Sequence, residues 1–428
     1  MSEKQDAGAV VDMGFVGQVA CVARTAEGRC LVRRLHRQDG LDQRPQGIPL
    51  RLHVGWGQRL GAFVAAYHRL IERVVACHGA DEELRRVIGV PRELAEAVRD
   101  ARDTRVHLLR ADVLPQMEGG LRVLETNANC PAGLYRSGRG RAGWRPLLAA
   151  HGLRLPAPLP TDAHEWAGRW LLDLAERHTG VRPDTVAVLC PHGANRLDVD
   201  AFLTGLRRIG VRALAGDPRE LRAGPRGVLL HGEPVHHAYA KIGMQDLLRM
   251  SRDIQPYLRA VREGTLFVQN GLRGRVIGDN KLCLAVLSDP RFAGLFPAQD
   301  YALVRPATPW SRNIARCDVA TVHRIRAGRD RYVLKRPLDT RGRGVVIGKD
   351  VMTVGTWQEA VSRAITQGWL VQEYCPAPRI SLDDRAQPYR YDLALGAVDG
   401  RLVGAFSRLG TQERLNVART GQLHPLYL

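Results

Sequence analysis

The chain has 428 residues, of which 45% are apolar and 25% charged, and its formal net charge is +19 at pH 7. Because this length exceeds one ordinary hydrophobic core, we expect two or three subdomains. No stretch approaches 18 consecutive apolar residues, which argues against a transmembrane span.

The polar start MSEKQDAGAVVDMG lacks the basic and apolar regions of a secretory signal, and we expect its first dozen residues to be frayed. The cysteines are scattered and form no CxxC pair, a pattern that favours reduced thiols in the cytoplasm over disulfides or a zinc site.

The positive charge raises the question of nucleic-acid binding. However, the basic residues form no run of five or six, and no RRM, KH, zinc-finger or basic-zipper signature matches. Only five of the 63 basic residues are lysine, a bias typical of a GC-rich genome. The remaining lysines, among them Lys281 and Lys335, are candidates for positions that need a compact ammonium group.

The N-terminal part begins with valine-rich residues 14–34, which predict a pair of strands around a turn at Glu27-Gly28. Residues 60–102 then place apolar side chains three and four apart, the period of an amphipathic helix, and Pro91 marks the start of a further helix. Two strands follow at 106–112 and 121–127.

Residues 137–141 predict a flexible basic loop, and the proline-rich residues 153–161 are the best candidate for a linker. Next comes a short α/β pattern: helices at 165–177 and 199–209, and strands at 185–190, 212–215 and 227–231. A helix at 245–262 and a strand at 265–269 follow. We therefore expect a mixed α/β fold with divisions at 1–152, 153–264 and 265–428, the middle one a small parallel-sheet domain.

The first group of polar residues lies on the two strands at 106–127. Arg110 and Asp112 share one face of the first strand, and Glu125 and Asn127 share one face of the second. If the strands pair, two carboxylates and an amide oxygen converge, which are ligands that Mg²⁺ accepts. The alternative is a surface hairpin with ordinary polar residues.

The second group is a strand ending at Lys335, followed by a loop that contains Gly342 and Gly344. An ammonium group and close-approaching backbone N–H groups are a common way to hold phosphates. The loop is neither a Walker loop nor a Rossmann fingerprint, and the alternative is a hairpin turn with a basic tip.

A third group is the apolar strand 369–374, which ends in Gln372-Glu373 and could hold an adenine or a ribose. The alternative is an ordinary buried strand. Asn280-Lys281 precedes a helical run and could bring a second ammonium group to the phosphates. Arg408 and Asn416 follow the strand 401–407.

Taken together, these motifs resemble those of the ATP-grasp ligases, specifically the circularly permuted group typified by glutathionylspermidine synthase. In that group an R-x-D … E-x-N segment supplies the transition-state arginine and the magnesium ligands, which implies these roles for Arg110 and for Asp112, Glu125 and Asn127. The order of the motifs, with the metal ligands ahead of the lysines, is the permutation itself.

The resemblance also assigns the nucleotide and substrate residues. The ATP-binding residues that it implies are Lys281, Lys335, Gly342, Gly344, Gln372 and Glu373. Asn129 lies in what looks like the family's substrate-facing loop, and Arg408 and Asn416 are further substrate candidates. The amidase domain of the synthase has no counterpart here, and Arg341 and Arg343 receive no role.

The expected cofactors are therefore ATP and Mg²⁺, and the expected partners are a small-molecule carboxylate and an amine, with a carrier protein as a further candidate acceptor and no membrane. The implied activity is a carboxylate–amine ligase that works through an acyl phosphate. A phosphotransferase and a basic nucleic-acid-binding protein are the competing interpretations.

Overall fold

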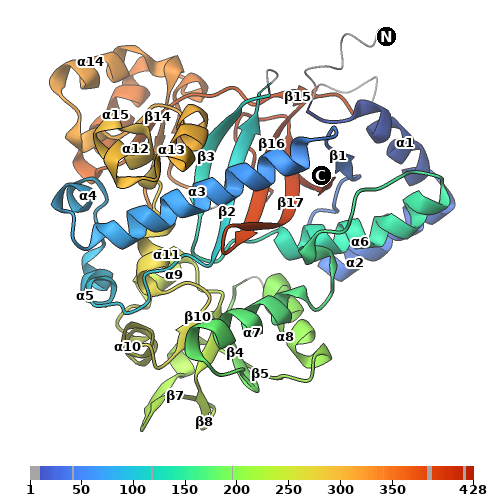
Figure 1. The fold of residues 1–428 in the computed structure, drawn as a ribbon. Coiled ribbons are helices and arrows are strands. Elements are labelled where there is room, and N and C mark those ends of the chain that lie inside the picture. Colours follow the sequence, from blue (N-terminus) through green and yellow to red (C-terminus); the bar gives the residue numbers. More distant parts are fainter. Residues whose placement is uncertain are drawn as a thin grey trace.

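The structure is a computed structural model that describes residues 10–40, 43–116, 119–194, 196–340, 342–382, 388–417 and 421–428. It shows a mixed α/β architecture built on one large sheet (Figure 1). Among the described residues, none of the helices combines the length and the apolar composition that crossing a bilayer requires.

The large sheet has seven strands among the described residues, in the order β1-β18-β17-β16-β2-β3, with β15 beside β16. These strands are β1 (Leu50–Arg51), β2 (Leu108–Pro115), β3 (Leu121–Asn127), β15 (Arg379–Ile380), β16 (Tyr389–Val398), β17 (Arg401–Gly410) and β18 (Gln422–Tyr427). The predicted pairing of residues 106–112 with 121–127 is confirmed, because β2 and β3 are antiparallel neighbours. Since β2 lies between β3 and β16, every residue of β2 is buried.

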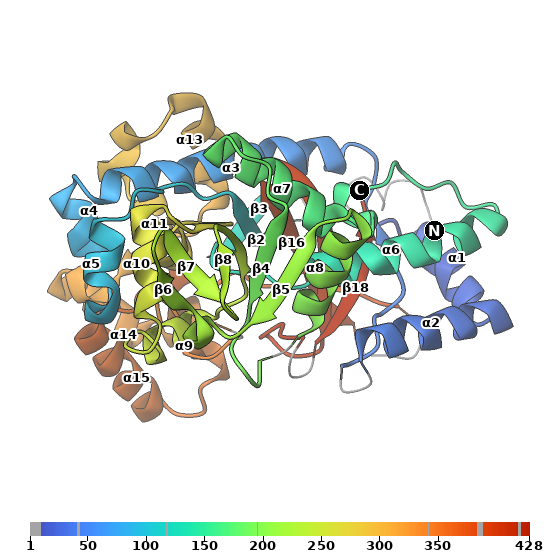
Figure 2. The ribbon, with the colours of Figure 1, turned by 90° about the horizontal axis from the view of Figure 1, so that it is seen from below.

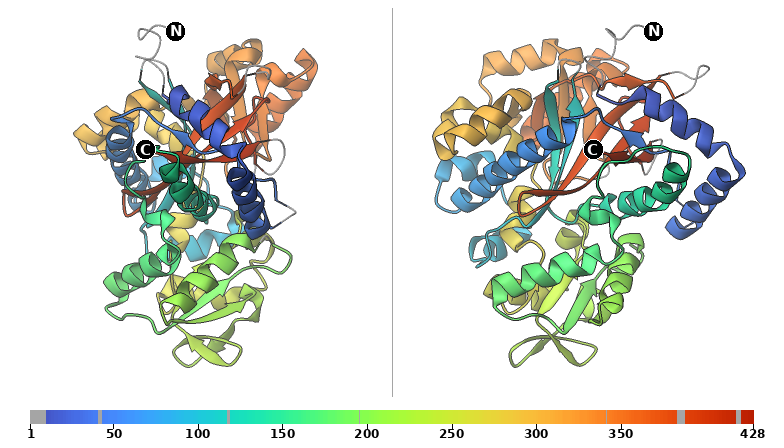
Figure 3. Two further views of the ribbon diagram at one scale, coloured as in Figure 1. Left: turned by 90° about the vertical axis from the view of Figure 1, so that its right-hand side faces the viewer. Right: turned by 45° about the vertical axis from the view of Figure 1, so that its right-hand side comes forward.

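The two faces of the large sheet differ in what covers them. On one face the long helix α3 (Trp56–His78) crosses the strands (Figure 1), and its apolar stripe packs in one core with Leu109, Ala111 and Val113. Because side chains alternate along a strand, Arg110 and Asp112 face the other side. There α6 (Leu134–Ala150) and the small domain lie against the sheet (Figure 3).

The small domain contains a parallel sheet in the order β10-β9-β4-β5, which confirms the expected parallel α/β unit (Figure 2). Its elements are α7 (Trp166–Thr179), β4 (Thr185–Leu189), α8 (Leu197–Arg208), β5 (Arg212–Gly216), β9 (His237–Ala240) and β10 (Phe267–Val268). The predicted strand at 227–231 lies outside this sheet, because β7 (Gly227–Leu230) pairs with β6 (Arg222–Gly224) and β8 (Glu233–Val235) in a separate antiparallel sheet.

A third sheet, which we call the clamp sheet, is antiparallel and has the order β11-β14-β12-β13. Its strands are β11 (Ser311–Asn313), β12 (Tyr332–Lys335), β13 (Val345–Ile347) and β14 (Leu370–Glu373). The helices α14 (Val319–Ala327) and α15 (Val354–Gln367) support it through a core around Trp357. Beside it lie α12 (Cys283–Ser288) and α13 (Ala298–Val304).

Two local predictions are wrong. Residues 14–34 form the helices α1 (Met13–Ala23) and α2 (Ala26–Asp39), because the side chains of Asp12 and Thr25 accept hydrogen bonds from first-turn N–H groups. The expected loop at 137–141 lies inside α6, where Gly138 allows the helix to approach the backbone of Thr161 and the buried Arg141 pairs with Asp162.

Other expectations need smaller corrections. The helix at 245–262 is two helices, α9 (Met244–Arg249) and α10 (Gln255–Glu263), and residues 60–102 also contain α4 (Glu82–Val87) and α5 (Ala95–Arg99). Pro91 precedes the short 3₁₀ turn that leads into α5. Of the dozen residues expected to be frayed, 1–9 lie outside the described residues, whereas Val10 and Val11 are buried.

A buried histidine connects the large sheet to the small domain. His107 precedes β2, its Nδ1 lies 3.0 Å from Asp399 Oδ1, and its Nε2 lies 3.7 Å from Asp103 Oδ2. Asp399 also pairs with Arg177 of α7 at 2.6 Å. Although burial opposes the charged imidazolium, the two carboxylates raise the pKa of His107 above its ordinary value.

We expect the imidazolium of His107 to stabilise the fold in a pH-dependent way. Because the folded-state pKa is raised, this contribution is fully present below the unfolded pKa of about 6.5 and is lost as pH rises through the folded-state pKa. Urea unfolding of wild type and His107→Gln between about pH 5 and 9 should therefore show a difference in free energy that shrinks as pH rises. The exposed His323 on α14 provides the control His323→Gln; an equally pH-dependent difference in that variant would contradict the assignment.

Candidate active site

The predicted group on the β2–β3 hairpin does converge. Arg110 lies opposite Asn127 and Asp112 lies opposite Glu125. The amide Nδ2 of Asn127 donates to Asp112 Oδ2 at 3.3 Å. The register and the alternation of side chains place the carboxyl groups of Asp112 and Glu125 next to each other on the face opposite α3.

A β-bulge on β3 shapes this hairpin. The register passes from Asp112–Glu125 to Val113–Val123, so Leu124 has no partner on β2. The carbonyl oxygen of Leu124 instead accepts a hydrogen bond from Lys335 Nζ at 2.8 Å. The bulge therefore links the large sheet to the clamp sheet.

Asp112 is wholly buried between two arginines. Arg110 donates to both of its oxygens at 2.7 and 2.9 Å, and Arg408 Nη2 lies 2.9 Å from its Oδ2. Burial alone would favour the neutral acid, but Arg110 and Arg408 hold the pKa of Asp112 well below its usual range. Asp112 is thus an ionised carboxylate that is already neutralised by the protein.

Both predicted lysines reach this hairpin from other elements. Lys335, at the end of β12, donates to Gln372 Oε1 at 2.6 Å as well as to Leu124. Lys281, ahead of α12, donates to the carbonyl of Asp339 at 2.5 Å and lies 3.5 Å from Glu125 Oε2. Burial and the neighbouring Lys281 lower the pKa of Lys335 to about 8, although Glu125 acts in the opposite direction.

The glycine loop is fixed near Lys281 by Asp339. Gly344 has φ +63°, and a Cβ atom there would lie 2.5 Å from Asp339 Oδ2, so only glycine fits. Gly342 also has a positive φ, and a Cβ atom there would lie 3.2 Å from the amide of Asn416. Arg343 is exposed, and Arg341 lies outside the described residues.

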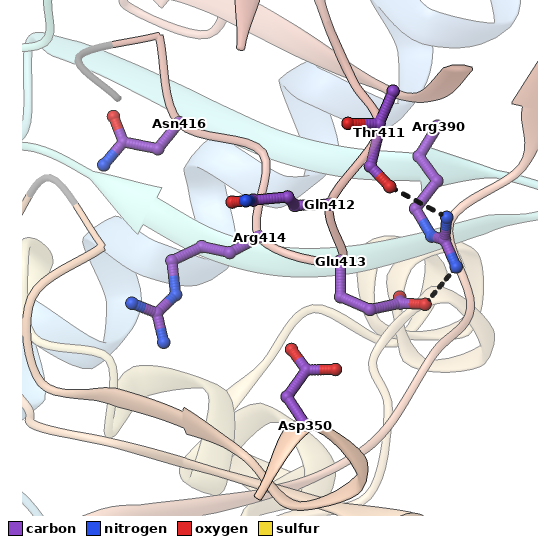
Figure 4. A pocket seen from close by; sticks show the side chains of 7 residues that line it. All are labelled: Asp350, Arg390, Thr411, Gln412, Glu413, Arg414 and Asn416. Atoms are coloured by element: carbon purple, nitrogen blue, oxygen red, sulfur yellow. Dashed lines mark hydrogen bonds and ion pairs between the residues drawn. The ribbon is translucent and has the colours of Figure 1, made fainter. Parts of the chain in front are cut away.

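A polar cavity of about 570 Å³ opens next to this loop (Figure 4). Asp350, Arg390, Thr411, Gln412, Glu413, Arg414 and Asn416 line it. Glu413 pairs with Arg390 and Lys349, and accepts a hydrogen bond from Tyr374 at 2.5 Å. The predicted residue Asn416 thus belongs to the wall of this cavity, directly beside Gly342.

The two residues at the end of β14 differ in their surroundings. Gln372 is buried and fixes Lys335, whereas Glu373 is exposed and its backbone N–H donates to the Trp310 carbonyl at 2.8 Å. Of the four side chains of β14, only that of Glu373 is therefore exposed enough to contact a ligand.

The donor set fits a magnesium ion in part. Glu125 is partly exposed, with 27% of its side chain accessible, and Asn127 is also partly exposed, so both can offer an oxygen. Asp112 can do so only if a guanidinium contact is exchanged. Among the described residues, no group of three or more His, Cys, Asp or Glu side chains is placed to hold a metal, so any site here depends on the Asn127 amide oxygen.

Asn129 is placed differently from the other predicted residues. Its amide is buried, accepts a hydrogen bond from Arg275 Nε at 2.6 Å and donates to the Ile242 carbonyl at 3.0 Å. Its backbone N–H, like that of Ala128, donates to Asp279. Asn129 therefore fixes the loop after β3 against the small domain.

One member of the site was not predicted. Asp392 on β16 is wholly buried and accepts from the guanidinium of Arg408 through both oxygens: Oδ2 lies 3.0 Å from Nε and 2.5 Å from Nη2, and Oδ1 lies 3.2 Å from Nε. The signal in the sequence is a charge at the start of the apolar stretch 391–398 of β16, but its partner on β17 becomes visible only when the hairpin is paired.

No known protein-family profile matches the chain, and no curated protein sequence matches it. Among solved structures, a glutathione synthetase-like effector from Globodera pallida in its apo form is similar over 97% of each chain, with a TM-score of 0.62 and 14% identity. A putative gamma-glutamylcysteine synthetase from Methylobacillus flagellatus has a TM-score of 0.42 and 12% identity, over 82% of this chain and 84% of that one. D-alanyl-alanine synthetase A from Vibrio cholerae has a TM-score of 0.28 and 10% identity, over 58% of this chain and 88% of that one.

At such identities only the fold is established, by the full-length likeness to the effector. The expected mixed α/β fold is thereby confirmed, in the form that the effector shares.

We expect Asn129 to act on stability. Asn129→Ala would leave the buried Arg275 guanidinium short of an acceptor, so unfolding should become easier by about 1–3 kcal/mol. The urea midpoint of unfolding measures this. Asn127→Ala is the matched control, because that amide is less buried and makes longer contacts of 3.3 and 3.5 Å. A larger loss of stability in Asn127→Ala than in Asn129→Ala would contradict this role.

Proposed function

We propose that the protein is an ATP-dependent carboxylate–amine ligase with a circularly permuted ATP-grasp order. The observation that carries the proposal is the approach of Lys281 to Glu125 at 3.5 Å, while Lys335 binds the carbonyl of Leu124, the residue next to Glu125. Asn127 shares the face of Glu125 on the same strand. Oxygen ligands for a divalent ion and ammonium groups for phosphates belong together where a nucleoside triphosphate binds. The likeness to a glutathione synthetase-like effector favours small amino-acid or peptide-like substrates.

ATP is proposed to lie between the large sheet and the clamp sheet. Lys281 and Lys335 contact its phosphates, and the backbone of Gly342 and Gly344 covers them. Gln372 holds Lys335 in place, and Glu373 faces the base or the ribose. Glu125 and Asn127 would hold Mg²⁺, with Asp112 as a third ligand after it exchanges a guanidinium contact. When bound, the ion would neutralise charge on the phosphate oxygens.

The reaction proposed is a two-step acyl transfer. An oxygen of the substrate carboxylate attacks the γ-phosphorus, the bond to the β-phosphate oxygen breaks, and ADP leaves with that electron pair. The amine nitrogen then attacks the acyl carbon, loses a proton, and expels inorganic phosphate. Arg110 and Arg408 stabilise the negative charge that develops in each step, as positioned cations do in other phosphoryl and acyl transfers.

Glu125→Ala and Lys335→Ala should each lower turnover by about 10²–10³-fold while leaving the fold intact, because each removes one fixed charge at the phosphates. ADP release in a screen of amino acids, small peptides and amines measures turnover, and circular dichroism measures the fold. Glu359→Ala, an exposed glutamate of α15, is the control and should retain full activity. Substantial activity in either site variant would defeat the proposal.

The affinity for MgATP should fall as pH rises above about 8. Lys335 has a pKa of about 8 without ligand, and the triphosphate favours its charged form, so above this pH binding must be accompanied by uptake of a proton. Calorimetry should show Kd rising by up to about tenfold per pH unit, the limit for one titrating group. Lys335→Arg stays charged and should show a flatter profile; the same steep profile in that variant would assign the effect to another group.

A further inference from the structure

Asp392 is held in the centre of the large sheet. Its carboxylate accepts from the backbone N–H of Arg408 at 3.1 Å and from the guanidinium Nε and Nη2 at 3.0 and 2.5 Å. The strand register places Asp392 directly opposite Arg408 on β17. The side chain of Asp392 is wholly buried, and the guanidinium group of Arg408 neutralises the charge of its carboxylate.

Arg408 is thereby clamped between two carboxylates. Its Nη2 contacts Asp392 at 2.5 Å and Asp112 at 2.9 Å, and its Nε contacts Asp392. Nη1 has no hydrogen-bond partner among the described residues, and 13% of the side chain is accessible. One edge of the guanidinium is therefore fixed, and the remaining nitrogen can donate to a ligand oxygen.

Stability alone does not account for this arrangement. A buried chain of alternating charges is often no more stable than apolar residues of the same volume. The ion pairs connect Arg110, Asp112, Arg408 and Asp392 in that order, and Asp112 lies opposite Glu125 on the neighbouring strand. Asp392, the second carboxylate on Arg408, fixes the orientation of its guanidinium group.

We propose, on the basis of the ligase function above, that Asp392 is a positioning residue that fixes Arg408. It holds Nε and Nη2 so that Nη1 can contact an anionic oxygen of the substrate carboxylate, of the transferring phosphoryl group or of the acyl phosphate. Without Asp392 the guanidinium would turn its Nε edge toward Asp112, the neighbouring carboxylate, and Nη1 would lose its place.

The test is steady-state kinetics on the full chain, with ADP release as readout and the best acid–amine pair from the screen as substrates. Asp392→Asn should lower kcat by about 10–100-fold, the range seen for residues that orient a direct ligand, with KM for ATP changed less than about threefold. Asp392→Glu keeps the charge, should fold, and should recover part of kcat.

The control for lost stability is Asp39→Asn. Asp39 is also buried and paired with two arginines, Arg136 at 2.6 Å and Arg139, but it lies on α2, away from the site. This variant should lose as much thermal stability as Asp392→Asn and keep its kcat.

A double-mutant cycle separates positioning from a structural role. If Asp392 acts through Arg408, then Asp392→Asn should have no further effect on kcat in the Arg408→Ala background. Full additivity in the cycle, or wild-type kcat in Asp392→Asn, would overturn the positioning role while leaving the ligase function intact. Absence of ADP release by wild type with any acid–amine pair would overturn the ligase function, and the positioning role with it.

Discussion

The site depends on charges of opposite sign that meet where the clamp sheet rests on the large sheet. Lys335 is buried there with its pKa lowered to about 8, and its contacts are two neutral oxygens, from Leu124 and Gln372. Glu125 is the carboxylate that most favours the charged form of Lys335, and it also lies 3.5 Å from Lys281. Among the described residues no carboxylate is in direct contact with the ammonium group of Lys335, so a polyanion would supply the negative charge that this buried cation lacks.

The sheet itself sets the geometry of these charges. Alternation along β2 directs Leu109 and Ala111 to the α3 side and Arg110 and Asp112 to the other. The bulge at Leu124 releases one carbonyl from the ladder, and this carbonyl becomes the point at which Lys335 attaches. A shift of β2 by one residue would point Arg110 and Asp112 into the hydrophobic core under α3. The packing of α3 therefore also fixes which face of the sheet carries the site.

The parts of the site that the sequence predicted are those set by local pattern. The alternation of polar residues within the hairpin and the strand ending at Lys335 are short-range features, and the structure places them as expected. The N-terminal helices were missed because valine-rich residues with the same apolar content suit either structure, and the caps at Asp12 and Thr25 decide it. The helix at 137–141 was missed because its glycines and arginines act through tertiary contacts, such as Arg141 with Asp162.

The same distinction explains Asn129 and Asp392. Asn129 follows the hairpin motif directly, yet its partners Arg275 and Ile242 lie far along the chain and give it a structural place. Asp392 pairs with Arg408, which in turn reaches Asp112, so its role requires that β16 and β17 be paired beside β2. Contacts between residues far apart in sequence therefore decide the surroundings of both residues.

The order of elements along the chain has a consequence for how the site assembles. The hairpin β2–β3 precedes both the small domain and the clamp sheet, but its neighbour β16 follows them, so these two units lie within the connection between strands of one sheet. Arg110 and Asp112 are in place early in the chain, whereas Asp392 and Arg408 join them only when the C-terminal strands close the sheet. Because contacts between residues so distant in sequence tend to form slowly, the charge network around Asp112 should be among the last features to form. Arg110 already has Asp112 on its own strand and Arg408 has Asp392 within the β16–β17 hairpin, but the contact between Arg408 and Asp112 requires β16 beside β2, so the network is complete only when the whole sheet is.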